Sequence, residues 1–266
     1  MRGCRRATYA AALQPTIRPM TYCCAVKLNA GLVFASDSRT HAGVDNIGRF
    51  SKLHVLEQPG ERVITMLSAG NLSVTQGAIE HLHRAVRQGD VLNWTNAASM
   101  ADVAMLLGQA MRQVRERDEP YLTKSGIDAS ASFLLGGQIQ GERPRLFLVY
   151  SEGNAIEATA ETPFLQIGEI KYGKPILDRV IRPEIGLLDA TKCVLVSFDS
   201  TMRSNVSVGL PIDLQLLPIN HLRADMKFHI DEQDAYWREL SDRWAVGVRR
   251  VFAELPPPQW YPDTQQ

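Results

Sequence analysis

The sequence predicts an α+β fold, a four-layer αββα sandwich of two mainly antiparallel sheets. Strand-like runs come in groups, a pair of helical segments follows each group, and this alternation occurs twice along the chain. Stacking two sheets between two helical layers buries one face of every element in that order. At 266 residues with 45% hydrophobic content, the chain can bury such a core as one domain.

The first half of the chain supplies strands and then helices. Apolar runs rich in β-branched and aromatic residues predict strands at residues 21–28, 32–36, 52–57 and 62–68. The last two are joined through Pro59-Gly60, a turn dipeptide. Two helices follow, because apolar residues recur at helical spacing from Val74 to Val86 and from Met100 to Val114.

The second half repeats this order. We expect strands at 132–140, 145–150 and 155–165, helices at 174–182 and 187–196, and strands at 207–217 and 226–230. A last helix, capped by Asp231, is predicted to face inward through five apolar residues: Trp237, Leu240, Trp244, Val248 and Val251. The proline-rich segment 256–266 is predicted to be an extended or frayed tail.

Residues 1–20 are predicted to lie outside the folded domain, which we place at 21–255. Positions 1–19 hold four arginines and no acidic residue, a pattern shared by targeting peptides, propeptides and spurious upstream starts. The apolar run at 7–13 is short for a secretory signal. Our hypothesis is that translation starts at Met20 and that removal of this methionine exposes Thr21.

Composition narrows the classes of partner. The chain has 29 basic and 29 acidic residues, so its formal charge of zero suggests neither a nucleic acid nor a membrane surface as a partner. With a net charge of zero, copies of the chain do not repel one another, so charge does not oppose self-association. No apolar run approaches about 18 residues, the length of a transmembrane helix. The four cysteines show no paired-ligand spacing, which favours a reduced, cytoplasmic protein. The six histidines are scattered, so we expect no metal site, and we expect no organic cofactor.

Three residues have the types needed for an N-terminal threonine nucleophile. Thr21 opens the first strand, Asp37 ends the second, and Lys52 begins the third. A threonine hydroxyl needs a base within hydrogen-bond reach, and a free α-amine, with a pKa of about 7.7–8.0, can serve. A lysine ammonium lowers the pKa of neighbouring groups, and a carboxylate holds the lysine in place. If Thr21 is internal, its nitrogen is an amide and the residues form an inert strand.

The same stretch resembles a known family. The segment from Gly31 through Asp37 to Arg39, then Lys52 and Ser68-Ala69-Gly70, resembles the β-type subunits of proteasomes and their bacterial relatives. Three runs are similar to the Anbu family, the bacterial "ancestral β-subunit": Thr21-Tyr22-Cys23, Ser36-Asp-Ser-Arg-Thr-His-Ala-Gly-Val-Asp45 and Asp199-Ser-Thr-Met-Arg-Ser-Asn205. The resemblance covers roughly residues 20 to 255.

This resemblance implies an N-terminal nucleophile hydrolase fold and a role for each matching residue. Thr21 would be the nucleophile, with Asp37 and Lys52 as its charged partners and Arg39 two residues beyond the aspartate. The backbone N–H of Gly70 would help to form the oxyanion hole.

Two positions depart from the family pattern. The serine of the usual Gly-Ser-Gly segment is absent, since the stretch reads Ile167-Gly168-Glu169-Ile170. A supporting aspartate with a serine three residues later maps ambiguously, either onto Asp199 with Ser200 or onto Thr201 with Ser204. We favour Asp199.

The sequence therefore predicts a threonine-type endopeptidase that hydrolyses peptide or unfolded-protein substrates inside a ring or helical homo-oligomer. One alternative is an inactive scaffold or sequestering assembly, and another is a small-amide amidohydrolase of the same fold. The run from Gly168 to Lys174 has phosphate-loop spacing, but Pro175 stands where that motif needs serine or threonine. Substrate preference and any ATPase partner are not readable from the sequence.

Overall fold

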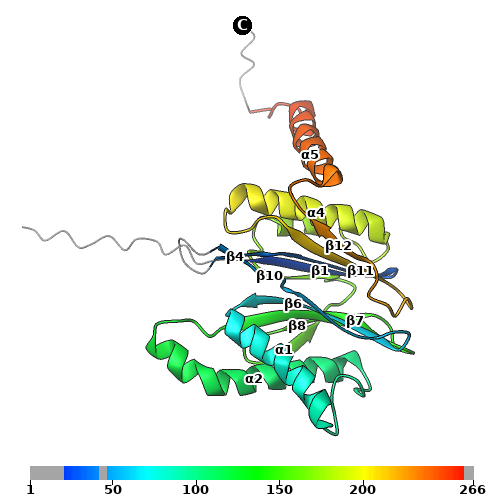
Figure 1. The fold of residues 1–266 in the computed structure, drawn as a ribbon. Coiled ribbons are helices and arrows are strands. Elements are labelled where there is room, and N and C mark those ends of the chain that lie inside the picture. The colour runs from blue at the N-terminus through cyan, green and yellow to red at the C-terminus, as the bar shows by residue number, and fades with distance from the viewer. Residues whose placement is uncertain (1–20, 42–46, 261–266) are drawn as a thin grey trace, which may run out of the picture.

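The computed structural model describes residues 21–41 and 47–260, and its elements stack as the predicted αββα sandwich (Figure 1). Two five-stranded antiparallel sheets lie face to face, with strand orders β10-β1-β2-β11-β12 and β5-β6-β7-β8-β9. Helices α1 and α2 cover the outer face of the second sheet, and α4 covers the outer face of the first. Residues 1–20, and the tail beyond 260, lie outside the described residues.

The first sheet contains the chain segments on either side of Asp37. Its strands are β1 (Tyr22–Leu28), β2 (Gly31–Asp37), β10 (Phe164–Gly168), β11 (Ile212–Pro218) and β12 (Lys227–Ile230). The pairing of Leu28 with Gly31 closes the β1–β2 hairpin on two residues. Gly31 has φ of +137°, and a Cβ there would overlap the Leu217 carbonyl oxygen. This tight turn fixes a register that puts Asp37 beside the start of β1.

The second sheet consists of β5 (Leu53–Gln58), β6 (Arg62–Gly70), β7 (Ala131–Ile139), β8 (Arg145–Val149) and β9 (Ala155–Glu157). A separate two-stranded ribbon, β3 (Arg39–His41) with β4 (Ile47–Arg49), was not predicted from the sequence. Because this ribbon leads from β2 into β5, it carries the chain from one sheet to the other.

The helices are α1 (Leu72–Gln88), α2 (Met100–Lys124), α3 (Lys174–Val180), α4 (Leu187–Ser204) and α5 (Ala235–Glu254). Local capping sets the starts of the first two. The Asn71 side chain accepts from two backbone N–H groups of α1, and Ser99 forms a capping box with Asp102 in α2. Pro175 occupies the first turn of α3, where its missing N–H costs no helical bond.

Strand alternation divides the core into layers. In β1, Cys23 and Ala25 join the apolar cluster between the sheets, whereas Tyr22, Cys24 and Val26 pack against the outer helices. A third cluster fills the space between the second sheet and α1 with α2. Every residue of β1 except Lys27 is buried, so the strand that follows the threonine is packed on both faces.

Three predicted boundaries were wrong. The strand expected at 155–165 is two strands, β9 and β10, in different sheets, separated by a segment that contains Pro163, which has no N–H to donate. The strand expected from 207 begins at Ile212, after Pro211. The helix expected to end at 196 continues to Ser204, which places Asp199 inside α4.

The last helix also differs from its prediction. Its N-cap is Asp234, whose side chain accepts from the Trp237 N–H at 2.7 Å, while Asp231 accepts from Gln233 in the preceding turn. Only Trp237 of the five predicted inward residues is buried, and Leu240 is partly buried. Trp244, Val248 and Val251 are 37%, 47% and 53% exposed, because α5 extends beyond the body of the chain (Figure 1).

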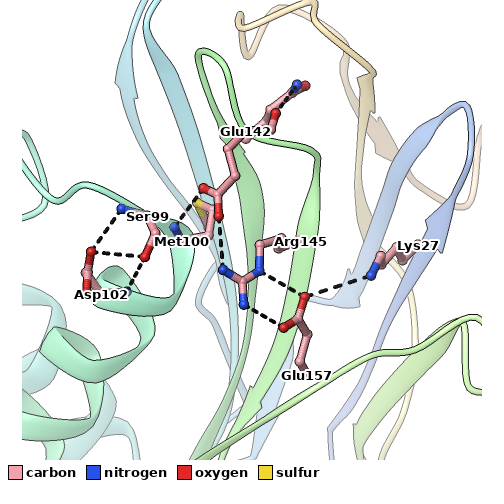
Figure 2. Close-up of polar contacts among 8 residues, drawn as sticks. Lys27, Ser99, Met100, Asp102, Glu142, Arg145 and Glu157 are labelled. Atoms are coloured by element: carbon pink, nitrogen blue, oxygen red, sulfur yellow. Dashed lines mark hydrogen bonds and ion pairs between the residues drawn. The ribbon is translucent and has the colours of Figure 1, made fainter.

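A charged network joins the second sheet to its neighbours (Figure 2). Arg145 donates to both carboxylate oxygens of Glu157, at 2.9 and 2.6 Å, and to Glu142 at 3.0 Å. Glu142 also accepts from the Met100 backbone N–H at the start of α2, at 2.9 Å. Lys27 of the first sheet lies 3.9 Å from Glu157. We refer to Lys27, Glu142, Arg145 and Glu157 as the Arg145 network.

Candidate active site

Asp37 is the centre of a cluster at one end of the first sheet. One of its carboxylate oxygens, Oδ1, accepts from the Thr21 hydroxyl, from the Tyr22 backbone N–H at 3.0 Å, and from the Lys52 ammonium at 2.8 Å. Thr21 stands immediately before β1 and Asp37 ends β2, so the hairpin register brings them together. The predicted convergence of Thr21, Asp37 and Lys52 is therefore present in the structure.

Lys52 reaches this cluster from the other sheet. It lies just before β5, and its backbone carbonyl accepts from the Ser68 N–H of β6 at 3.0 Å. Its Nζ donates to the Arg39 carbonyl oxygen at 2.7 Å as well as to Asp37. The residue is 8% exposed, so these bonds replace water around the ammonium.

Burial dominates the electrostatics of the cluster. Asp37 is fully buried, which raises the pKa of its carboxyl above the usual value, although Lys52 and the donated hydrogen bonds oppose the shift. The other oxygen, Oδ2, is buried and accepts no hydrogen bond from residues 21–41 or 47–260. Burial also raises the pKa of the nearby Cys23 thiol to about 12. Cys23 is therefore a protonated thiol near neutral pH, the form that is a poor nucleophile.

The remaining predicted residues occupy different places. Arg39 contributes its carbonyl to Lys52, and its guanidinium lies over the backbone of Gly209. Gly70 ends β6 with φ of +100°, where a Cβ would overlap the Ser130 carbonyl, so the position requires glycine. Asp199 bonds Arg203 at 3.0 Å and Ser241 of α5 at 2.6 Å, and thereby links α4 to α5. The catalytic roles of these three residues stay predictions.

Glu169, which lies within the stretch that lacks the family's serine, had no predicted role. Its backbone N–H donates to the Thr21 carbonyl at 2.7 Å, and Gly168 lies against the Thr21 backbone. The buried Glu169 carboxylate accepts from Asn205 at 2.9 Å and from the Lys171 N–H at 3.2 Å. A polar residue directly after an apolar strand was the only sequence signal for it.

Two absences concern cofactors and membranes. Within residues 21–41 and 47–260, no three His, Cys, Asp or Glu side chains are grouped as metal ligands. None of the helices in those ranges combines the length and apolar character needed to cross a bilayer.

Solved structures provide the comparison with known proteins, since neither the protein-family models nor the curated proteins gave a match. Anbu (ancestral beta-subunit) from Yersinia bercovieri is 46% identical, with a TM-score of 0.85, over 91% of this chain and 100% of that one. Anbu from Hyphomicrobium sp. strain MC1 is 45% identical, with a TM-score of 0.83, over 90% and 100%. The helical assembly of the Anbu complex from Pseudomonas aeruginosa is 44% identical, with a TM-score of 0.86, over 91% and 100%. At this identity over nearly the whole of each chain, the protein belongs to the Anbu, or ancestral β-subunit, family.

Proposed function

We propose that the protein is a threonine-type peptidase in which Thr21, as the first residue of the mature chain, is the nucleophile. The observation that carries this proposal is the bonding of one Asp37 oxygen by both the Thr21 hydroxyl and the Lys52 ammonium. A lysine that is buried and doubly bonded holds its ammonium in a fixed place beside the threonine. That charge lowers the pKa of a neighbouring amine, so that more of the amine is in the basic form near neutral pH.

The chemistry follows from this placement. The α-amine of Thr21 takes the hydroxyl proton as Oγ1 attacks a peptide carbonyl, and the N–H of Gly70 stabilises the resulting oxyanion. The amine then returns the proton to the leaving nitrogen, which breaks the peptide bond and leaves an acyl-enzyme. Water hydrolyses this ester and regenerates Thr21. No step requires a metal or an organic cofactor.

The test removes the hydroxyl while preserving its surroundings. The chain is produced with Thr21 directly after the initiator methionine, and intact mass and N-terminal sequencing verify that it begins at Thr21. We expect Thr21→Val to lower hydrolysis of capped fluorogenic peptides by roughly 10³-fold or more. Thr21→Ser, which retains a hydroxyl, should keep measurable activity. Thr75→Val, which removes a buried hydroxyl in α1, is the matched control and should leave activity unchanged.

The same experiment separates the alternatives. If wild-type protein with a free Thr21 amine cleaves neither peptides nor a denatured protein, the scaffold function is the better account. Cleavage of simple acyl-amides without cleavage of peptides would favour the amidohydrolase instead.

We also infer that the protein works as a homo-oligomer. The Pseudomonas aeruginosa relative was solved as a helical assembly, and α5 of this chain presents apolar side chains that its own body does not cover. Phe252 is 75% exposed and Val251 is 53% exposed. We expect Phe252→Asp to lower the molar mass measured by light scattering, whereas Val91→Asp, at a 98% exposed position outside the helices, should not. An unchanged molar mass for Phe252→Asp would show that α5 takes no part in the contact between subunits.

A further inference from the structure

Asp213 of β11 bonds the immediate neighbours of both charged partners of Thr21. Its Oδ2 accepts from the Ser38 hydroxyl at 2.8 Å and from the Ser51 hydroxyl at 2.9 Å. Ser38 directly follows Asp37, and Ser51 directly precedes Lys52. One carboxylate oxygen is thus linked through two short side chains to the backbone on either side of the Lys52–Asp37 ion pair.

The position of these two segments in the fold explains why such a link matters. Asp37 belongs to the first sheet and Lys52 leads into the second, so their 2.8 Å contact depends on how the sheets are aligned at this end. Residues 50–52 lie between β4 and β5 and belong to neither strand. A backbone bond from the Phe50 N–H to the Ser38 carbonyl, at 3.3 Å, and the two serine bonds to Asp213 hold this segment against the first sheet.

Asp213 is suited to this task by its own anchoring. It lies in β11 opposite Ser36 of β2, in a continuous antiparallel ladder. The Ser38 N–H adds a backbone bond to the Pro211 carbonyl at 2.9 Å. The other carboxylate oxygen, Oδ1, lies 2.8 Å from Nδ1 of His229 in β12. Both oxygens therefore have partners, and hydrogen bonds to an ionised acceptor are stronger than neutral ones.

We propose that Asp213 is a positioning residue that sets the separation of Asp37 and Lys52 through Ser38 and Ser51. It does not touch the reacting atoms. Its effect on catalysis rests on the proposed function of Thr21, whereas its effect on the ion pair does not. Loss of the carboxylate releases the 50–52 segment, lengthens the Lys52–Asp37 contact and exposes the Lys52 amine.

The test measures the Lys52 amine directly, without any need for hydrolysis. Reductive methylation with formaldehyde and borohydride, followed by peptide mass spectrometry, gives the modification rate of each lysine. We expect Lys52 to react roughly tenfold faster in Asp213→Ala than in wild type, as loss of charge-assisted bonds implies. Ser51→Ala, at an exposed residue, should give a smaller increase and carries the test if Asp213→Ala folds poorly.

Two controls separate positioning from a general loosening of the fold. Lys27, at the far end of β1, should keep its wild-type modification rate in every variant. His229→Leu removes the partner of the other oxygen while leaving both serine bonds, so its Lys52 rate should stay near that of wild type. An unchanged Lys52 rate in both Asp213→Ala and Ser51→Ala overturns the proposal.

A kinetic readout then links positioning to catalysis. We expect Asp213→Ala to lower kcat by roughly 10- to 100-fold with KM nearly unchanged, since small displacements of catalytic groups carry penalties of this order. A wild-type kcat together with an accelerated Lys52 rate would overturn the catalytic part. Absence of hydrolysis in wild type counts against the proposed function of Thr21, and the Lys52 rates still decide the role of Asp213.

Discussion

Asp37 and Glu157 are both carboxylates paired with a cation, yet they lie in opposite electrostatic surroundings. Asp37 is fully buried, and burial raises its pKa despite the adjacent Lys52. The Glu157 side chain is 34% exposed, and hydrogen bonds from Arg145 lower its pKa (Figure 2). An ion pair that only stabilises the fold shifts its members toward their charged forms. Perturbed pKa values of buried groups beside a charged partner are more frequent at functional sites than elsewhere.

The hydrogen bonds that the two carboxylates accept are also distributed differently over their oxygens. Each Glu157 oxygen accepts from Arg145, so its charge is spread over both atoms. Asp37 accepts three donors on Oδ1, and none of the residues that the structure describes donates to its buried Oδ2. The two clusters thus differ both in burial and in how their carboxylates are hydrogen-bonded.

The largest expected effect comes from removing the cation of the buried pair. Lys52→Met leaves the Asp37 charge buried without a counterion, and we expect the free energy of unfolding to fall by about 3–5 kcal/mol. Arg145→Met removes the cation of the partly exposed network and should cost about 1 kcal/mol or less. Urea unfolding at fixed protein concentration measures both changes.

A double variant shows whether the loss arises from the unpaired charge. Lys52→Met combined with Asp37→Asn should be clearly more stable than the sum of the two single losses predicts, because the uncompensated charge is gone. Additive losses would mean that Asp37 and Lys52 contribute independently, and the contrast with the Arg145 network would fail.

The convergence of Thr21, Asp37 and Lys52 could be predicted from the sequence, for a physical reason. Thr21 and Asp37 flank one hairpin whose register is set by the pleat and a two-residue turn, and both signals are local. The family resemblance added the prediction that Lys52, which comes from the other sheet, lies at the same place. Local pattern and resemblance together were enough to predict the layers of the fold.

Asp213 and Asp199 show why the rest was not predictable. Asp213 is separated by 175 residues from Ser38 and by 162 from Ser51, so no spacing rule connects them. Asp199 was matched by motif, but one of its two observed bonds depends on a helix–helix contact with Ser241, 42 residues later. Periodicity also predicted an inward face for α5, although the described part of the chain leaves that face exposed beyond Leu240.

A smaller expected effect concerns pH, because the two carboxylates change the stability of the folded state in opposite directions as pH rises. Because folding raises the Asp37 pKa, the folded state binds more protons, and its stability falls as pH rises from the unfolded pKa through the folded one. Glu157 has a lowered pKa, so its contribution is present above its unfolded pKa and is lost as pH falls through the folded value. Each slope is limited to about 1.4 kcal/mol per pH unit.

Unfolding of two variants between about pH 3.5 and pH 6 measures these slopes. Relative to wild type, the deficit of Glu157→Gln should grow as pH rises, whereas that of Asp37→Asn should shrink. Deficits that move in the same direction would show that both carboxylates are ordinary structural ion-pair members.

The smallest expected effect is the stability lost in Glu157→Gln, about 0.2–1 kcal/mol, because its partners are partly exposed and water already solvates them. Raising the salt concentration from about 0.1 M to about 1 M shortens the Debye length from about 10 Å to about 3 Å, which should remove most of this loss. The Lys52→Met loss should barely change, since burial shields that pair from ions. A Glu157→Gln loss that persists in high salt would mean that the geometry of the Arg145 bonds, rather than charge, stabilises the network. In that case the two clusters differ in burial alone.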